Sequence, residues 1–156
     1  MCFGNTARSP AAQGIAEWLK NTKYQDELEG VQFDSAGFFN VYKTAQEGTI
    51  RYLKEKGIDY RDFRGKIVDS SLLEKQDLIL VMQERHLKRL MRKFKDVDGL
   101  ERKAHIIREF AGETEDIDIP DPVNKSDEEY KRLLEIVEDA VKKSVERIVA
   151  INNSHA

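Results

Sequence analysis

The residues best suited to chemistry lie in the opening stretch, MCFGNTARSP. It contains the only cysteine of the chain, Cys2, and five residues separate this cysteine from Arg8. A loop between the two could turn its backbone N–H groups inward around a tetrahedral oxyanion, and Arg8 could bind two of the oxygens in a fork. Gly4 and Asn5 tolerate the unusual backbone angles that such a loop requires. The same positive field would favour the thiolate of Cys2, which is the nucleophilic form.

The alternative is that Cys2 is incidental and that Arg8 is an exposed charge at the end of a helix. For a bare pair at this spacing the alternative would be favoured. Here a glycine and an asparagine lie between the two, and Ser9 and Pro10 follow directly. Serine as N-cap and proline at the first helical position are typical of a helix start. We therefore expect an anion-binding loop at the N-terminus of a helix, with Cys2 as nucleophile.

A proton donor could come from the segment DIDIPDPV at 116–123. Its two prolines exclude a helix and a central strand, so the segment should be a stiff loop. Asp116 and Asp118 are best interpreted as solvated loop charges. Asp121 could be a third such charge, but its place between two prolines suits a positioned general acid.

Size and composition indicate a single domain over residues 1–156, with 40% hydrophobic and 35% charged residues and a net charge of −3. This balance argues against a polybasic binder of nucleic acid or of membrane surfaces. There is no apolar run near the ~20 residues of a membrane span, and we expect no signal peptide because the apolar h-region is missing. One cysteine cannot form an internal disulfide or a cysteine metal cluster, and the three histidines show no metal spacing. We expect no metal, no cofactor and a cytoplasmic location.

Strands and helices must position these residues. Apolar runs alternate with amphipathic stretches along the sequence, and this pattern predicts an α/β fold with a mainly parallel sheet. The expected strands are 31–37, 77–82 and part of 103–110. Besides the helix at Ser9, a helix is expected over 85–94. Three further helices should begin at capping pairs, which are Thr44 and Glu47, Ser71 and Glu74, and Ser126 and Glu129. The buried stripe expected in the last helix is Leu133, Val137, Ala140, Val141, Ser144, Val145 and Ile148.

The stretch CFGNTARSP resembles the signature loop C-x-G-N-x-x-R-S-P of the low molecular weight protein tyrosine phosphatases. The likeness continues, in the family's order, through DSAG, YLKEKGID, DLILVM, REFAG and DIDIPDP. It implies a three-layer α/β fold, in which helices flank a four-stranded parallel sheet and the phosphate loop joins the first strand to the first helix. It also implies hydrolysis of phosphotyrosine monoesters in phosphorylated proteins through a phosphocysteine, without a metal or cofactor. The expected assembly is a monomer or a weak dimer.

The resemblance also implies a role for each residue of the site. Cys2 attacks phosphorus, Arg8 holds the equatorial oxygens, and Asp121 protonates the leaving oxygen and then activates water. Ser9 donates a hydrogen bond to the sulfur and helps it to leave. The loop residues expected to bind the substrate are Phe3, Gly4, Asn5, Thr6, Ala7 and Ser9.

Some positions depart from the family's pattern. Asn5 should lock the loop against Ser35, but Phe63 stands where relatives often have a histidine near this asparagine. Thr6 matches the branch of the family that removes phosphate from arginine, so a protein arginine phosphatase is the alternative function. Val123 follows the Asp–Pro pair, where relatives usually have aromatic residues. The aromatic residues that could form the opposite pocket wall, or pack in the core, are Phe38, Phe39 and Tyr42.

The first central strand of the family precedes the cysteine, whereas here only Met1 does. Its loss would remove four or five buried apolar side chains, at ~1.5–3 kcal/mol each, and leave strand edges unpaired. Either the true start lies upstream and supplies this strand, or the chain is a truncated, inactive phosphate-binding module. The intact helix caps and the full set of catalytic residue types favour an upstream start. A thiol-dependent arsenate reductase is disfavoured, because it would need further cysteines to relay electrons.

Overall fold

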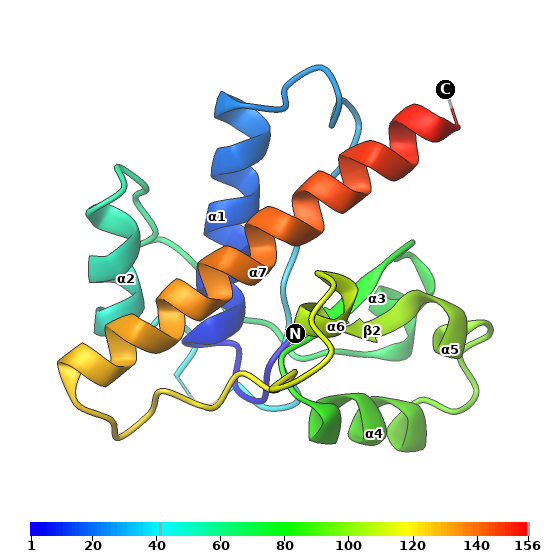
Figure 1. Cartoon of the computed structure of the whole chain (residues 1–156). Coiled ribbons are helices and arrows are strands. Elements are labelled where there is room, and N and C mark those ends of the chain that lie inside the picture. Colours follow the sequence, from blue (N-terminus) through cyan, green and yellow to red (C-terminus); the bar gives the residue numbers. More distant parts are fainter. Residues whose placement is uncertain (41, 156) are drawn as a thin grey trace.

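A parallel sheet lies between two layers of helices in the computed structural model, which describes residues 1–40 and 42–155 (Figure 1). Strand β1 (Ile79–Val81) pairs in parallel with β2 (Ala104–Ile106), and Leu80 lies opposite His105 in the register. Side chains of β1 alternate between the two layers. Ile79 and Val81 belong to one hydrophobic core, and Leu80 packs against the other. Burial on both sides explains the unbroken apolar run of the sequence.

The opening residues extend the sheet on the other side of β1. The N–H of Met82 donates to the carbonyl of Met1 at 3.1 Å. Cys2 forms a parallel bridge with Gly37, and Gly37 forms one with Ile67. The expected α/β fold with a parallel sheet flanked by helices is therefore confirmed. Of its four strands, however, the described residues form two, and isolated bridges stand in place of the others.

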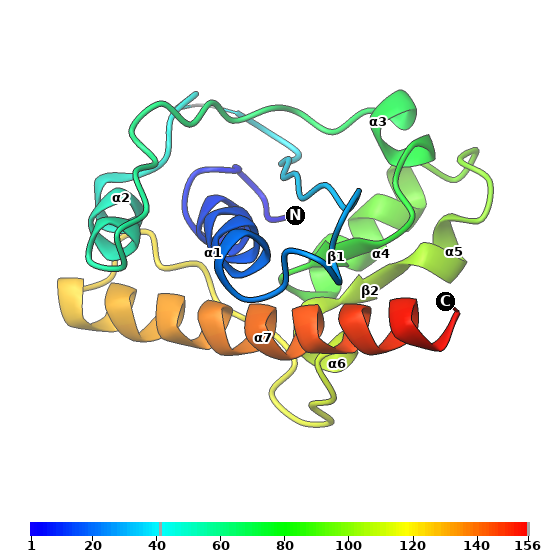
Figure 2. The same cartoon turned by 90° about the horizontal axis from the view of Figure 1, so that it is seen from above.

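One layer consists of α1 (Arg8–Thr22), α2 (Glu47–Lys54), α6 (Ile107–Phe110) and α7 (Asp127–Ser154). The long α7 runs beside α1 and reaches α2 at its N-terminal end (Figure 2). Ser126 caps α7 as expected, because its side chain accepts a hydrogen bond from the N–H of Glu129. The expected stripe is buried up to Val145, and Ile148 is partly buried. Within the described residues, no helix is both long and apolar enough to span a membrane.

The second layer contains α3 (Ser70–Glu74), α4 (Glu84–Lys93) and α5 (Leu100–Lys103). Buried residues of α4, such as Leu90, pack with Phe38 and with the facing side chains of β1 and β2. The two cores are thus separated by the sheet, and the loop that contains Cys2 lies at the end of that sheet nearest the start of α4 (Figure 1).

Three expected helix starts are wrong. Helix α1 begins at Arg8 rather than with Ser9 as its cap, because the Ser9 hydroxyl is engaged by the loop instead. The N-cap of α2 is Gln46, not Thr44, and that of α3 is Asp69, whose carboxylate accepts the N–H of Leu72. The expected strand at 31–37 is also absent, apart from the bridges at Gly37.

Candidate active site

The loop from Cys2 to α1 folds tightly around the cysteine side chain, which is buried. Asn5 has a φ of 52°, in the left-handed region that asparagine tolerates better than most residues. The loop also packs directly on the backbone of Gly37. A Cβ on this glycine would lie 2.7 Å from the nitrogen of Asn5 and 2.8 Å from the oxygen of Phe3, so only glycine fits there.

The side chain of Asn5 ties the loop together. Its Nδ2 donates to the hydroxyls of Ser9 and Ser35, both at 3.0 Å, and its Oδ1 accepts the N–H of Lys66 at 2.9 Å. The Ser9 hydroxyl lies 2.9 Å from Sγ of Cys2. Because Ser9 accepts from Asn5, its own hydrogen is free to point at the sulfur. The backbone of Lys66, which the sequence did not suggest, supplies the partner that Phe63 cannot.

Arg8 is only 1% exposed, and its guanidinium is held by residues outside the loop. Its Nη1 donates to Oε1 of Gln83 and to the carbonyl of Ile119, both at 2.7 Å. Its Nη2 lies 3.4 Å from Oδ2 of Asp121. Burial lowers the pKa of Arg8, while negative charge on Cys2 and Asp121 raises it. Nε of Arg8 is buried and has no partner among the described residues, so one charged donor remains available to an anion.

Asp121 stands at the rim, 37% exposed, with one carboxylate oxygen facing Arg8. Its other oxygen accepts the N–H of Val123 at 3.0 Å, which fixes the side chain in a local turn. The loop is anchored to the sheet where the N–H of Ile119 donates to the carbonyl of Met82 at 2.9 Å. Asp121 is therefore accessible to solvent and still faces Arg8.

The other two aspartates of this segment point elsewhere. Asp118 accepts the N–H of Glu84 at 2.7 Å and so caps the start of α4. The side chain of Asp116 is exposed, and its carbonyl accepts a hydrogen bond from Arg108. In the part of the chain that is described, Asp121 is the carboxylate that forms an ion pair with Arg8.

Residues at the start of α2 and in α7 hold the outer part of the loop, and no pattern in the sequence predicts them. The N–H of Gln46 donates to the carbonyl of Thr6 at 2.7 Å, and its Nε2 lies 3.4 Å from the Thr6 hydroxyl. Thr49 donates to the carbonyl of Ala7 at 3.1 Å. The hydroxyl of Tyr130 lies 2.8 Å from that of Thr49 and donates to Oε1 of Gln46 at 3.2 Å. Such contacts join residues far apart in sequence, so no local pattern announces them.

Aromatic residues border the mouth on the side of α4. The rings of Phe3 and Phe39 lie 5.0 Å apart, and both side chains are exposed. The guanidinium of Arg89 lies 5.3 Å from the centroid of Phe3 and 5.2 Å from that of Phe39. Phe38 is buried in the core and cannot form a pocket wall, whereas Tyr42 is exposed.

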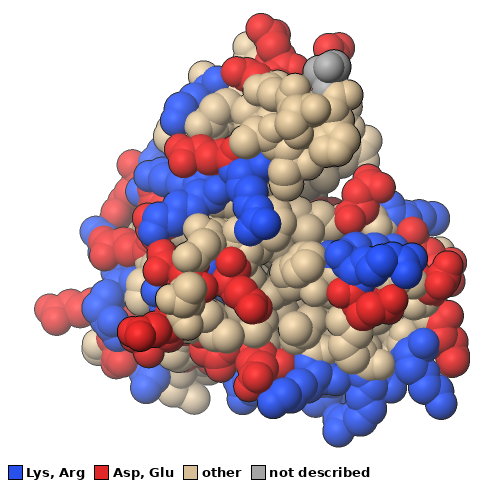
Figure 3. All heavy atoms as spheres, turned by 45° about the vertical axis from the view of Figure 1, so that its right-hand side comes forward, with Lys and Arg blue, Asp and Glu red and all other residues tan. Residues whose placement is uncertain are grey.

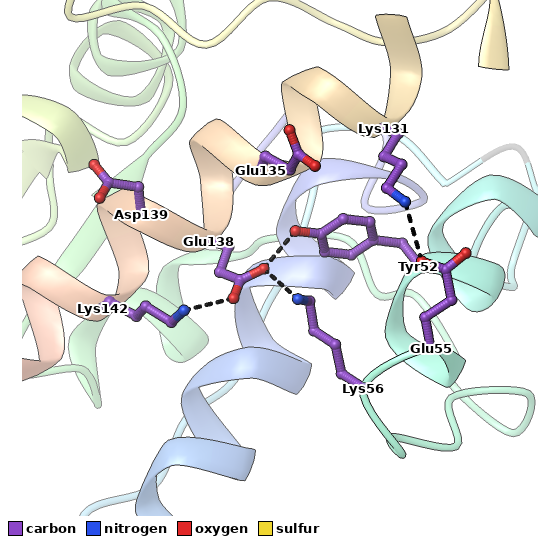
Figure 4. A pocket seen from close by; sticks show the side chains of 8 residues that line it. All are labelled: Tyr52, Glu55, Lys56, Lys131, Glu135, Glu138, Asp139 and Lys142. Atoms are coloured by element: carbon purple, nitrogen blue, oxygen red, sulfur yellow. Dashed lines mark hydrogen bonds and ion pairs between the residues drawn. The ribbon is translucent and has the colours of Figure 1, made fainter. Parts of the chain in front are cut away.

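A polar hollow of about 400 Å³ between α2 and α7 is separate from this loop (Figure 4). At its centre Glu138 accepts from the hydroxyl of Tyr52 and forms ion pairs with Lys142 at 2.6 Å and Lys56 at 2.8 Å. Burial would raise the pKa of Glu138, but its hydrogen bonds outweigh burial and lower the pKa to about 2. The ion pairs of Glu138 with Lys56, and of Lys131 with Glu55 at 3.3 Å, join the segment around α2 to α7. The lining residues are Tyr52, Glu55, Lys56, Lys131, Glu135, Glu138, Asp139 and Lys142.

Known proteins resemble this chain over nearly its whole length. The family model described as low molecular weight phosphotyrosine protein phosphatase matches residues 1–153. The chain is 29% identical to a probable low molecular weight protein-tyrosine-phosphatase, EpsP, of Ralstonia nicotianae, covering 97% of this chain and 94% of that protein. The structure of the tyrosine phosphatase Wzb from Escherichia coli K30 with sulphate superimposes with a TM-score of 0.75 at 28% identity, covering 94% and 93% of the two chains. The YwlE arginine phosphatase from Geobacillus stearothermophilus gives a TM-score of 0.84 at 25% identity, covering 99% and 94%. The chain therefore belongs to the low molecular weight phosphotyrosine protein phosphatase family.

Proposed function

We propose that this protein hydrolyses phosphotyrosine monoesters in phosphorylated proteins through a phosphocysteine intermediate. One observation carries the proposal. The buried Sγ of Cys2 lies beside the Ser9 hydroxyl within the loop, and the loop mouth is flanked by the pair of Arg8 and Asp121, 3.4 Å apart. This grouping supports the assignment of Cys2 as nucleophile, Arg8 as anion clamp and Asp121 as proton donor. Phosphorylated proteins of the cytoplasm are the proposed substrates, and a monomer or weak dimer is the proposed active form.

In the first step, the thiolate of Cys2 attacks phosphorus in line with the leaving oxygen. A sulfur–phosphorus bond forms, the phosphorus–oxygen bond to the tyrosine breaks, and Asp121 gives its proton to the leaving phenolate. Arg8 and backbone N–H groups of the loop hold the three equatorial oxygens, where charge accumulates. The unpartnered Nε of Arg8 is a ready donor for one of them, because a buried, charged donor gains most from an anionic acceptor.

In the second step, the carboxylate of Asp121 takes a proton from water, and the resulting nucleophile attacks the phosphocysteine. The sulfur–phosphorus bond breaks, and inorganic phosphate and the thiolate are released. The hydrogen bond from Ser9 to Sγ stabilises the leaving thiolate. Phe3, Gly4, Asn5, Thr6, Ala7 and Ser9 make up the proposed substrate-binding loop.

The test is rapid-quench kinetics with p-nitrophenyl phosphate and a phosphotyrosine peptide. Wild-type protein should release p-nitrophenol in a burst equal to the enzyme concentration, with phosphate held covalently on Cys2. Cys2→Ser should abolish the burst and the turnover. Asp121→Asn should slow the peptide reaction by ~10²-fold or more, the scale of general acid catalysis. Asp116→Asn, a matched change on the same loop, should leave both rates unchanged. Full turnover in Cys2→Ser would refute the proposed mechanism.

A protein arginine phosphatase is the second candidate, because Thr6 is present and the fold superimposes well on an arginine phosphatase. A phosphoarginine peptide and a phosphotyrosine peptide of the same sequence distinguish the two. If phosphoarginine is the better substrate, Thr6→Val, which replaces only the hydroxyl, should reduce its kcat/KM more than that for phosphotyrosine. If phosphotyrosine is hydrolysed faster and Thr6→Val leaves kcat/KM for both peptides unchanged, the arginine assignment is wrong.

A further inference from the structure

Helix α4 presents a row of cations on one face, which we call the basic face of α4. It consists of Arg85, Lys88, Arg89 and Arg92, spaced at i, i+3, i+4 and i+7. This spacing puts all four on one side of a helix. Arg85, Lys88 and Arg92 are exposed and Arg89 is half-buried, so the row faces solvent while the opposite side of α4 packs on the sheet.

Little negative charge balances the basic face. Among the residues described, only Lys88 of the four is paired with a carboxylate, that of Glu84 at 3.2 Å. Lys and Arg gather along the lower edge of the surface in Figure 3, at the level where α4 lies in Figure 1. Unpaired cations on one face attract an acidic partner and favour its approach in one orientation.

The basic face begins beside the phosphate loop. Nε of Arg85 donates at 3.2 Å to Oε1 of Gln83, the same oxygen that accepts from Arg8. The guanidinium of Arg89 lies between 5.2 and 5.4 Å from the centroids of three phenylalanine rings, those of Phe3, Phe38 and Phe39. These rings restrict the arginine, so it loses less conformational entropy when it binds a carboxylate.

We propose that the basic face of α4 binds acidic side chains that flank the phosphorylated residue of a protein substrate. The proposal rests on the phosphatase function proposed above and names its preferred substrates. From Arg85 to Arg92 the helix rises about 10 Å, which about three residues of an extended peptide span. Aspartate or glutamate within about four residues of the phosphorylated residue is therefore within reach of the face.

Two phosphotyrosine peptides of equal length test this, one with aspartate and glutamate at the flanking positions and one with asparagine and glutamine. The double variant Lys88→Gln/Arg92→Gln removes two exposed cations whose side chains make no described contact with the loop. The matched control is Lys54→Gln/Lys75→Gln, which removes two exposed cations on α2 and directly after α3.

Wild-type protein should prefer the acidic peptide by roughly three- to tenfold in kcat/KM at low salt, mainly through KM, because exposed ion pairs are individually weak. The preference should be much reduced at 0.5 M salt and in Lys88→Gln/Arg92→Gln, and retained in the control. All three proteins should hydrolyse p-nitrophenyl phosphate equally.

Equal rates for the two peptides in the wild type, or the same loss of preference in both double variants, would overturn the proposed binding face. Failure of the wild type to hydrolyse p-nitrophenyl phosphate and both peptides would instead overturn the phosphatase function itself. The two failures are therefore distinguishable.

Discussion

Asn5 is the residue whose replacement tests the construction of the loop most directly. Its side chain is fully buried and makes three hydrogen bonds, to Ser9, Ser35 and the N–H of Lys66. Asn5→Ala removes all three, at ~1 kcal/mol net each, and puts alanine, which tolerates a left-handed φ less well than asparagine, at this position, at a further ~1 kcal/mol. The free energy of unfolding should fall by about 4 kcal/mol, a large part of the ~5–15 kcal/mol typical of a domain.

Asn5→Gly separates the two contributions, because glycine adopts the φ of 52° without strain but makes none of the three hydrogen bonds. It should cost about 1 kcal/mol less than Asn5→Ala. In both variants the Ser9 hydroxyl is no longer held toward Sγ of Cys2, so kcat with p-nitrophenyl phosphate should fall at least tenfold. This ~1.4 kcal/mol change in barrier is the scale of one lost hydrogen bond to a charged group.

Urea unfolding followed by circular dichroism, together with steady-state kinetics, measures both effects. Ser35→Ala is the control, because it leaves two of the three bonds of Asn5 in place. It removes the bond to Asn5 and the bond from Ser35 to Gln13 at 2.6 Å, so its cost should be about 1–2 kcal/mol. A loss below about 1 kcal/mol in Asn5→Ala, with unchanged kcat, would refute the conclusion that this side chain holds the loop.

Three further changes test two contacts of the loop and one buried histidine. Gln83→Leu removes a buried hydrogen-bond acceptor that lies 2.7 Å from Nη1 of Arg8. We expect kcat/KM for p-nitrophenyl phosphate to fall and inhibition by inorganic phosphate to weaken, each roughly tenfold. Unchanged values would show that Arg8 is positioned without Gln83. Tyr130→Phe removes the hydroxyl that contacts Thr49 and Gln46. The free energy of unfolding, measured by urea titration, should fall by about 1–2 kcal/mol. No loss would mean that these contacts add no stability. His86 is buried, and burial together with the charge of Arg8 lowers its pKa to about 3. Because the unfolded chain takes up this proton near pH 6.5, the stability that neutral His86 contributes is present above that pH and is lost as pH falls toward 3. Thermal melts of His86→Leu should show a flatter pH dependence over this range, and an unchanged slope would contradict the assignment.

Much of the fold could be predicted from local patterns. The apolar run at 77–82 predicts β1 because both faces of that strand are buried, and the buried stripe of α7 follows from its helical spacing. The prediction of a strand at 31–37 was wrong, because within this segment only Gly37 forms β-bridges. The predicted starts of α1, α2 and α3 were wrong, because the side chains expected as caps form other hydrogen bonds or lie too far from the first turn.

By itself, the sequence determined the chemical parts of the proposed site, because Cys2, Arg8 and the residues between them lie within one short stretch of the chain. Only the tertiary structure decided what surrounds them. Gln83 is 75 residues from Arg8, and Lys66 is 61 residues from Asn5. The carboxylate of Asp121, which the flanking prolines had already singled out, is turned toward Arg8 by the packing of its loop against β1 and α4. Contacts across such separations arise when the chain buries its two cores, and they leave no periodicity in the sequence from which they could be predicted.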